Sequence, residues 1–100
     1  MQTTITARHR GEVPEDLRAL ARDILGRLTR VGSRPQRAQV VFDAEHHRKI
    51  VEVQVSLPRG QVCVASAEAG DFRTALDRAA AKLRRQLRKS ADRRQDRKAR

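Results

Sequence analysis

Residues 36–68 read QRAQVVFDAEHHRKIVEVQVSLPRGQVCVASAE, and this stretch decides the fold. Apolar and polar residues alternate in three runs, at residues 36–45, 49–57 and 61–68. A period of two is typical of strands that bury one face. The linking segments, His46-His47-Arg48 and Pro58-Arg59-Gly60, are short enough for hairpins. The stretch therefore predicts an antiparallel meander of three strands.

A helical pattern follows the meander. Asp71, next to Gly70, has a side chain that suits the N-cap of a helix. Apolar residues then recur at intervals of one, three and four, at Phe72, Ala75, Leu76, Ala79, Ala80, Leu83 and Leu87. This spacing predicts a helix from Asp71 to about Ala91 with one apolar side.

A second helical pattern precedes the meander. Pro14 suits the first turn of a helix, and the acidic Glu15 and Asp16 favour its N-terminus. The apolar residues of this pattern are Leu17, Leu20, Ala21, Ile24, Leu25 and Leu28. They predict a helix over residues 14–30. Ahead of it, Gln2–Ala7 contains three threonines and Ile5, which favours a short strand.

The predicted order is thus β-α-β-β-β-α, an α+β fold in a single domain over residues 1–91. A four-stranded sheet with one apolar face must bury that face, and two helices packed side by side on it can do so. The other face is expected to be solvated. Residues 92–100 have no apolar stripe, and we expect a basic, disordered tail that orders on a partner.

The charge of the chain is large and unevenly distributed. Lys and Arg total 23 against 12 Asp and Glu, a net charge of +11. Residues 38–83 carry six bases and six acids, whereas residues 84–100 carry nine bases and two acids, and residues 1–37 carry eight bases and four acids. A neutral middle between basic flanks indicates a binding surface for a polyanion, with nucleic acid the first candidate.

Helical geometry places many of these bases on the sides of the helices that face away from the sheet. On the first predicted helix Arg22 and Arg30 lie opposite the apolar stripe, with Arg18 and Arg27 beside them. On the second, the bases away from the apolar stripe are Arg78, Lys82, Arg85, Arg88 and Lys89. We expect both basic sides to point outward together. The only aromatic residues, Phe42 and Phe72, fall on apolar faces, so recognition should use shape and phosphate contacts rather than aromatic stacking.

Other site chemistries are disfavoured. Adjacent side chains such as those of His46 and His47 diverge, and no Cys or acidic cluster has metal-ligand spacing. Cys63 lies among small residues, which favours a core thiol, and Asp43, Glu45 and Glu52 have no supporting nuclease motif. We expect no catalytic activity, no cofactor, no metal and no small-molecule substrate.

The location of the protein is also predicted. The N-terminal residues have no secretory apolar segment, and no apolar stretch approaches a membrane span. A single cysteine excludes an internal disulfide. We therefore expect a cytoplasmic protein without a membrane partner.

The chain resembles the ribosome hibernation-promoting factor and ribosome-associated inhibitor family. Ile5-Thr6-Ala7-Arg8-His9 is similar to the family's I-T-G-[RK]-N. The most specific resemblance is to the motif A-x-A-E…D-x-Y-x-A-I-D…K-L-x-R-Q-L-x-K. The matching residues are Val64-Ala65-Ser66-Ala67-Glu68, Asp71, Ala75-Leu76-Asp77, Lys82-Leu83 and Arg85-Gln86-Leu87. Glu12-Val13, Leu17-Arg18 and Arg27-Leu28 resemble the family's first helix, so the likeness covers nearly the whole chain.

The resemblance implies a fold related in shape to double-stranded RNA-binding domains, and a site on the small ribosomal subunit. There the family contacts rRNA in the mRNA and tRNA channel and silences translation in stress or stationary phase. Recurrent family positions match Arg27, Lys82, Arg85, Gln86 and Lys89. Resemblance and helix geometry together give the candidate RNA-binding residues: Arg8, Arg18, Arg22, Arg27, Arg30, Arg73, Arg78, Lys82, Arg85, Gln86, Arg88 and Lys89.

Three features depart from the family pattern. Arg73 stands where the family usually has Tyr, which replaces an aromatic ring with a cation. Ala7 and His9 replace the usual Gly and Asn in the first loop. The sequence also ends at Arg100 without the second domain of long family members. It therefore resembles the short form, and we expect a monomer off the ribosome that does not pair ribosomes by itself.

Two other functions remain open from the residues alone. One is a generic double-stranded RNA-binding module that acts off the ribosome. The other is a helix protein that binds an anionic membrane or a protein partner, which the basic tail would support. Cosedimentation with ribosomes distinguishes the first prediction from both.

Overall fold

A computed structural model describes residues 2–8, 13–28 and 35–98, with side chains as far as Lys89. The four strands are β1 (Gln2–Ala7), β2 (Arg37–Glu45), β3 (Arg48–Ser56) and β4 (Val62–Ala69). The helices are α1 (Glu15–Leu28) and α2 (Phe72–Lys98), and a short 3-10 turn, η1 (Pro58–Gly60), joins β3 to β4. The order β-α-β-β-β-α and the α+β class are confirmed.

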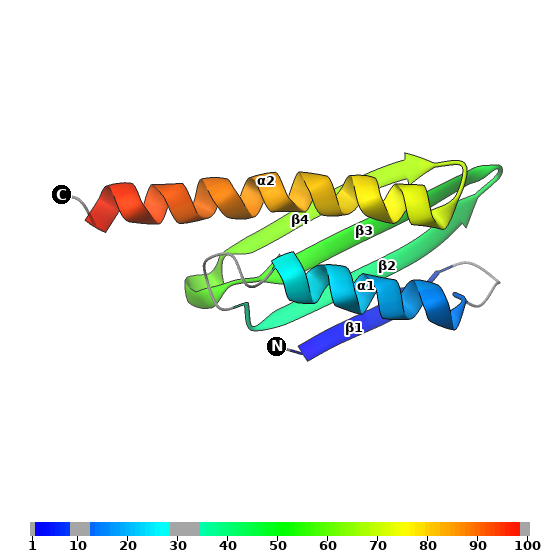
Figure 1. Cartoon of the computed structure of the whole chain (residues 1–100), viewed down its shortest axis with the longest axis horizontal. Helices are drawn as coiled ribbons and strands as arrows, with labels where there is room; N and C mark the ends of the chain where they lie inside the picture. The colour runs from blue at the N-terminus through cyan, green and yellow to red at the C-terminus, as the bar shows by residue number, and fades with distance from the viewer. Residues whose placement is uncertain (1, 9–12, 29–34, 99–100) are drawn as a thin grey trace.

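The strands form one sheet in the order β1-β2-β3-β4. The β2–β3 and β3–β4 pairs are antiparallel, as the meander predicted, whereas β1 pairs with β2 in parallel. A parallel pair requires a crossover connection, and α1 provides it. Both helices lie side by side on one face of the sheet and run in the same direction (Figure 1).

The core fills the space between this sheet face and the helices. Alternate residues of the central strands, such as Phe42 and Val53, are buried there against Leu25 and Leu83. The ring of Phe42 meets the ring of Phe72 edge to face, with centroids 5.4 Å apart. Phe42 is fully buried, and Phe72 is half-buried with Lys49 Nζ 5.3 Å from its ring centroid, so both rings already have partners within the protein.

The second helix is longer than the sequence predicted. Its apolar pattern ends near Ala91, but α2 continues to Lys98 and its C-terminal part extends past the sheet (Figure 1). Residues 92–98 contain neither Gly nor Pro, and Arg, Lys and Gln are strong helix formers. Intrinsic propensity therefore carries the helix beyond its packed segment. That residues 92–100 form a basic tail which orders on a partner stays a prediction.

Asp71 caps α2, as predicted. The backbone N–H of Thr74 donates to Asp71 Oδ2 at 2.9 Å, and the Thr74 hydroxyl donates to Oδ1 at 2.8 Å. These hydrogen bonds favour the charged carboxylate and hold the pKa of Asp71 below its usual value. Its contribution to stability is therefore present at neutral pH and disappears as the pH falls through the folded-state pKa.

We expect Asp71→Ala to lower the melting temperature by a few degrees at pH 7 and by less at pH 3, where a larger fraction of the carboxyl is protonated than at pH 7. Asp71→Asn is the matched control, because it keeps a capping oxygen but does not titrate near this pH. Thermal melts monitored by circular dichroism at both pH values measure the effect. An alanine penalty that is equal at pH 7 and pH 3 would show that the charge of Asp71 is irrelevant to the cap.

Candidate nucleic-acid interface

Three polar side chains of α2 lie over the free edge of β4. Arg78 Nη1 donates to the carbonyl oxygen of Glu68 at 3.0 Å, and Lys82 Nζ donates to that of Ser66 at 2.9 Å. Gln86 Nε2 donates to the carbonyl oxygen of Val64 at 2.6 Å. The four-residue spacing on the helix keeps the donors on one side, and the two-residue spacing on the strand turns the acceptors to one edge.

These contacts give the three residues a structural role that the sequence did not indicate. Among the described strands β4 pairs with β3 alone, so the backbone groups on its outer edge would otherwise be unpaired. The contacts leave spare donors, since a guanidinium carries five N–H groups and an ammonium three. Arg78 and Lys82 therefore retain hydrogen-bonding capacity for phosphate while they cover the edge.

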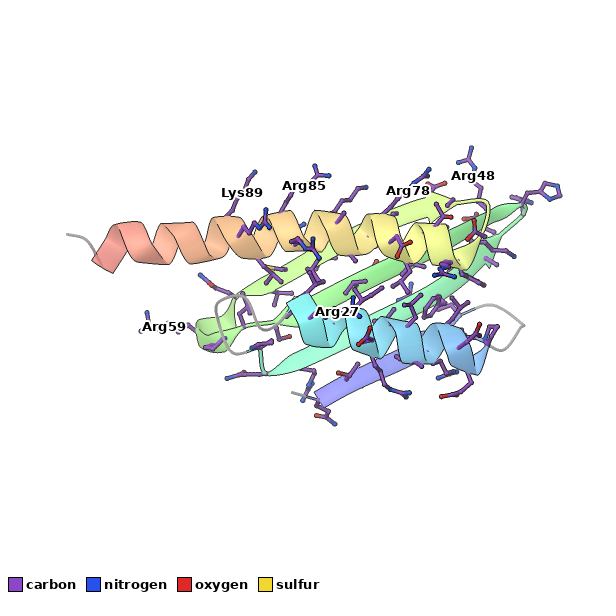
Figure 2. All side chains as sticks on the ribbon, viewed as in Figure 1. Arg27, Arg48, Arg59, Arg78, Arg85 and Lys89 are labelled. Atoms are coloured by element: carbon purple, nitrogen blue, oxygen red, sulfur yellow. The ribbon has the colours of Figure 1, made fainter. Side chains whose placement is uncertain are left out.

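Arg85 and Lys89 form the outer part of the α2 surface. Both are exposed, and Figure 2 shows them with Arg78 along the side of α2 away from α1. Within the described residues, neither makes a hydrogen bond or an ion pair with another side chain. They are free to contact a ligand without breaking a contact inside the protein.

A third group of bases lies between the helices. A cavity of about 120 Å³ is lined by Arg27 and Leu28 from α1 and by Arg84, Leu87 and Arg88 from α2. Figure 2 shows Arg27 between the two helices. Arg27 Nη2 also pairs with Asp23 at 2.9 Å, one turn earlier on α1.

Arg84 lines this cavity and is not among the candidates predicted from the sequence. It follows the buried Leu83 on the flank of the apolar stripe. The available signal was its four-residue spacing from Arg88, which places both on one flank. Only the position of α1 shows that this flank faces another helix.

The bases of α1 lie on different sides of the helix. Arg22 is exposed, and helical geometry places it about 140° around α1 from Arg27, the residue that lines the interhelical cavity. Arg22 pairs weakly with Glu15, 3.7 Å away, and Arg18 Nε donates to the carbonyl oxygen of Val13 at 3.3 Å. Both therefore lie on sides of α1 away from this cavity.

The remaining candidate RNA-binding residues lie away from the interhelical cavity or outside the described residues. Arg8 follows β1, and its backbone N–H donates to the carbonyl oxygen of Phe42 at 2.9 Å. The alternation of β1 places the exposed Arg8 on the sheet face opposite the helices. Arg73 is exposed in the first turn of α2, about 16 Å before Arg84 along the helix. Arg30 lies outside the described residues.

The described residues also give evidence on a nucleophilic thiol, a metal site and a membrane-spanning helix. Cys63 is half-buried, and burial raises the pKa of its thiol, which disfavours the nucleophilic thiolate. His46 and His47 are exposed at the β2–β3 turn, and no group of three metal-ligating side chains occurs in the described part of the chain. Among the described helices, none is long and apolar enough to cross a membrane.

Comparison with known proteins places this fold and its cationic helices in one family. Residues 3–95 match the family model described as "Sigma 54 modulation protein / S30EA ribosomal protein". The ribosome hibernation promoting factor of Pseudomonas putida is 35% identical over 95 residues, which cover 95% of this chain and 91% of that protein.

Two solved structures have the same fold. A ribosomal subunit interface protein from Coxiella burnetii superimposes with a TM-score of 0.81 at 28% identity, over 90% of this chain and 97% of that one. The N-terminal domain of Thermus thermophilus Protein Y gives a TM-score of 0.78 at 27% identity, over 89% and 98%. The chain belongs to the sigma 54 modulation protein and S30EA ribosomal protein family, the family of the ribosome hibernation promoting factors.

Proposed function

We propose that this protein is a ribosome hibernation factor that binds the small ribosomal subunit in the mRNA and tRNA channel and silences translation in stress or stationary phase. The family relationship and the names of the relatives support a ribosomal partner. The observation that carries the proposal is the layer of two parallel helices, in which α2 bears exposed bases that pair with no described side chain, above all Arg85 and Lys89.

This layer suits rRNA better than a protein partner. The guanidinium fork matches the phosphate group, and several phosphate contacts together release counterions. The face has no exposed aromatic residue among the described ones, so the binding energy comes from charge and shape. Such a surface acts without catalysis, as a cytoplasmic monomer that occupies a channel rather than converting a substrate.

Sucrose-gradient sedimentation of extracts from starved cells tests the proposal. We expect the protein in the fractions of small subunits or whole ribosomes at low salt. Because six to ten phosphate contacts lose a factor on the order of 10³–10⁵ between 50 and 200 mM salt, we expect its release as salt rises. Protein that stays at the top of the gradient at low salt would contradict the proposal.

The alternative, a generic double-stranded RNA-binding module, predicts a different result in a competition experiment. If the protein acts off the ribosome, an excess of plain RNA duplex should remove it from small subunits. We expect small subunits to retain it under that competition and purified protein to inhibit translation in vitro. Displacement by duplex at equal nucleotide concentration, without inhibition of translation, would favour the alternative.

A further inference from the structure

The cavity between α1 and α2 differs in chemistry from the rest of the cationic surface. Leu28 and Leu87, which are 4% and 9% exposed, supply its apolar lining, while Arg27, Arg84 and Arg88 supply its cations. A second hollow, on the outer side of α2, is lined by Ala67, Glu68, Arg78, Ala81, Lys82 and Arg85, so it has a carboxylate and no leucine side chain. The cavity therefore suits a ligand that is partly planar and apolar and partly anionic.

We propose that this cavity receives one unstacked nucleotide of a bound RNA. Its base lies against Leu28 and Leu87 and the faces of the guanidinium groups, and its phosphate lies at the arginine rim. The proposal rests on the RNA partner proposed above and adds what that partner must offer, a nucleotide outside a continuous stack. Arginine stacks on bases in the way an aromatic ring does, and neither aromatic ring of this chain lines the cavity.

The position of the cavity favours a base over a bare phosphate at its centre. An anion that lies against the leucine side chains, away from the guanidinium groups at the rim, loses hydration without compensation. The cavity also lies at the last described turn of α1, and the C-terminal end of a helix disfavours anions. A base meets neither penalty, and its sugar-phosphate group remains at the more exposed rim.

The three arginines are not equally available. Arg27 is oriented by its 2.9 Å ion pair with Asp23, which neutralises part of its charge. Arg84 and Arg88 are exposed and make no hydrogen bond or ion pair with any described side chain. These two residues are therefore expected to carry most of the nucleotide contact, and substitutions there should not break contacts within the fold.

Two RNAs of equal length separate this site from general phosphate binding. One is a perfect duplex and the other contains a single unpaired nucleotide. We expect the natural chain to bind the bulged RNA about tenfold more tightly, since the cavity holds the extra base. The variant Arg84→Lys/Arg88→Lys keeps the charge but loses the planar groups, so it should bind both RNAs equally, with duplex affinity within about twofold of the natural chain.

The matched control exchanges Arg85→Lys and Lys89→Arg on the outer side of α2, where the bulge preference should persist. Equal binding of both RNAs by the natural chain, or a bulge preference that survives in the Arg84→Lys/Arg88→Lys variant, would overturn the cavity proposal. Those results would leave ribosome cosedimentation intact, so they would not count against the proposed function. A chain that bound neither RNA nor ribosomes would overturn both.

Discussion

The double variant Arg85→Glu/Lys89→Glu is expected to bind ribosomes on the order of 100-fold more weakly than the natural chain while melting at nearly the same temperature. Both residues are exposed, and in the described part of the chain neither makes a hydrogen bond or an ion pair with another side chain. Each reversal removes one phosphate contact and adds a repulsion, so a tenfold loss for each residue is expected. The slope of log affinity against log salt should fall by about two.

Lys82 is left unchanged in this variant for a structural reason. The sequence alone would group it with Arg85 and Lys89, but its ammonium holds the carbonyl of Ser66 at the edge of β4. A substitution at Lys82 would mix an effect on RNA with an effect on the sheet. Restricting the variant to Arg85 and Lys89 makes the melting temperature a valid control for folding.

Charge reversal at two distant sites supplies the comparison. Arg37 lies on the open face of the sheet and Arg59 in the η1 turn, so Arg37→Glu/Arg59→Glu changes the net charge by the same amount. Binding of both variants to purified small subunits, measured at several salt concentrations, separates location from total charge. Equal losses for the two variants would mean that net charge, rather than the α2 face, drives binding.

The elements could be predicted because their signals are local. Alternation over residues 49–57 and the apolar spacing from Leu17 to Leu28 depend on neighbouring residues, so they indicate strand and helix without knowledge of the rest of the fold. The parallel pairing of β1 with β2 is not local, and nothing in Gln2–Ala7 specifies its partner. The alternation of apolar residues also predicted which face of the sheet the helices cover. The burial of Val51, Val53 and Val55 confirms it.

Of the candidate site, only the positive charge could be predicted from the sequence. A helical projection shows which residues oppose the apolar stripe, but it does not show which flank faces a second helix and which faces a sheet edge. That information separates Arg84 and Arg88 at the α1 flank from Arg78 and Lys82 at the β4 flank. Residues with the same chemistry and spacing therefore have different roles, set by tertiary neighbours.

Removal of the side chains that cover the β4 edge should make the protein self-associate. The triple variant Arg78→Ala/Lys82→Ala/Gln86→Ala loses three hydrogen bonds to the carbonyls of Glu68, Ser66 and Val64. Each exposed bond contributes about 0.5 kcal/mol or somewhat more, so the melting temperature should fall by several degrees. The larger effect is on association, because an uncovered edge presents unpaired backbone groups to another chain.

The side chains of β4 add to this tendency. Val62 and Val64 are 50% and 45% exposed on its open face, and pairing with a second β4 strand would bury part of both. An antiparallel pair of β4 strands around a twofold axis would close the assembly as a dimer and extend the sheet across it. We expect dimers at tens of micromolar in light scattering after size exclusion, and slower hydrogen exchange at the amides of Val64 and Ser66.

The control variant Arg85→Ala/Lys89→Ala removes two positive charges, as the triple variant does, but leaves the edge covered. If reduced charge repulsion alone caused association, both variants would dimerise. If both remain monomeric at high concentration, the three donors are not what protects the edge. Dimerisation of the triple variant alone would show that one helix of this fold serves two purposes, with an outer side free for RNA and a flank that keeps the sheet from pairing.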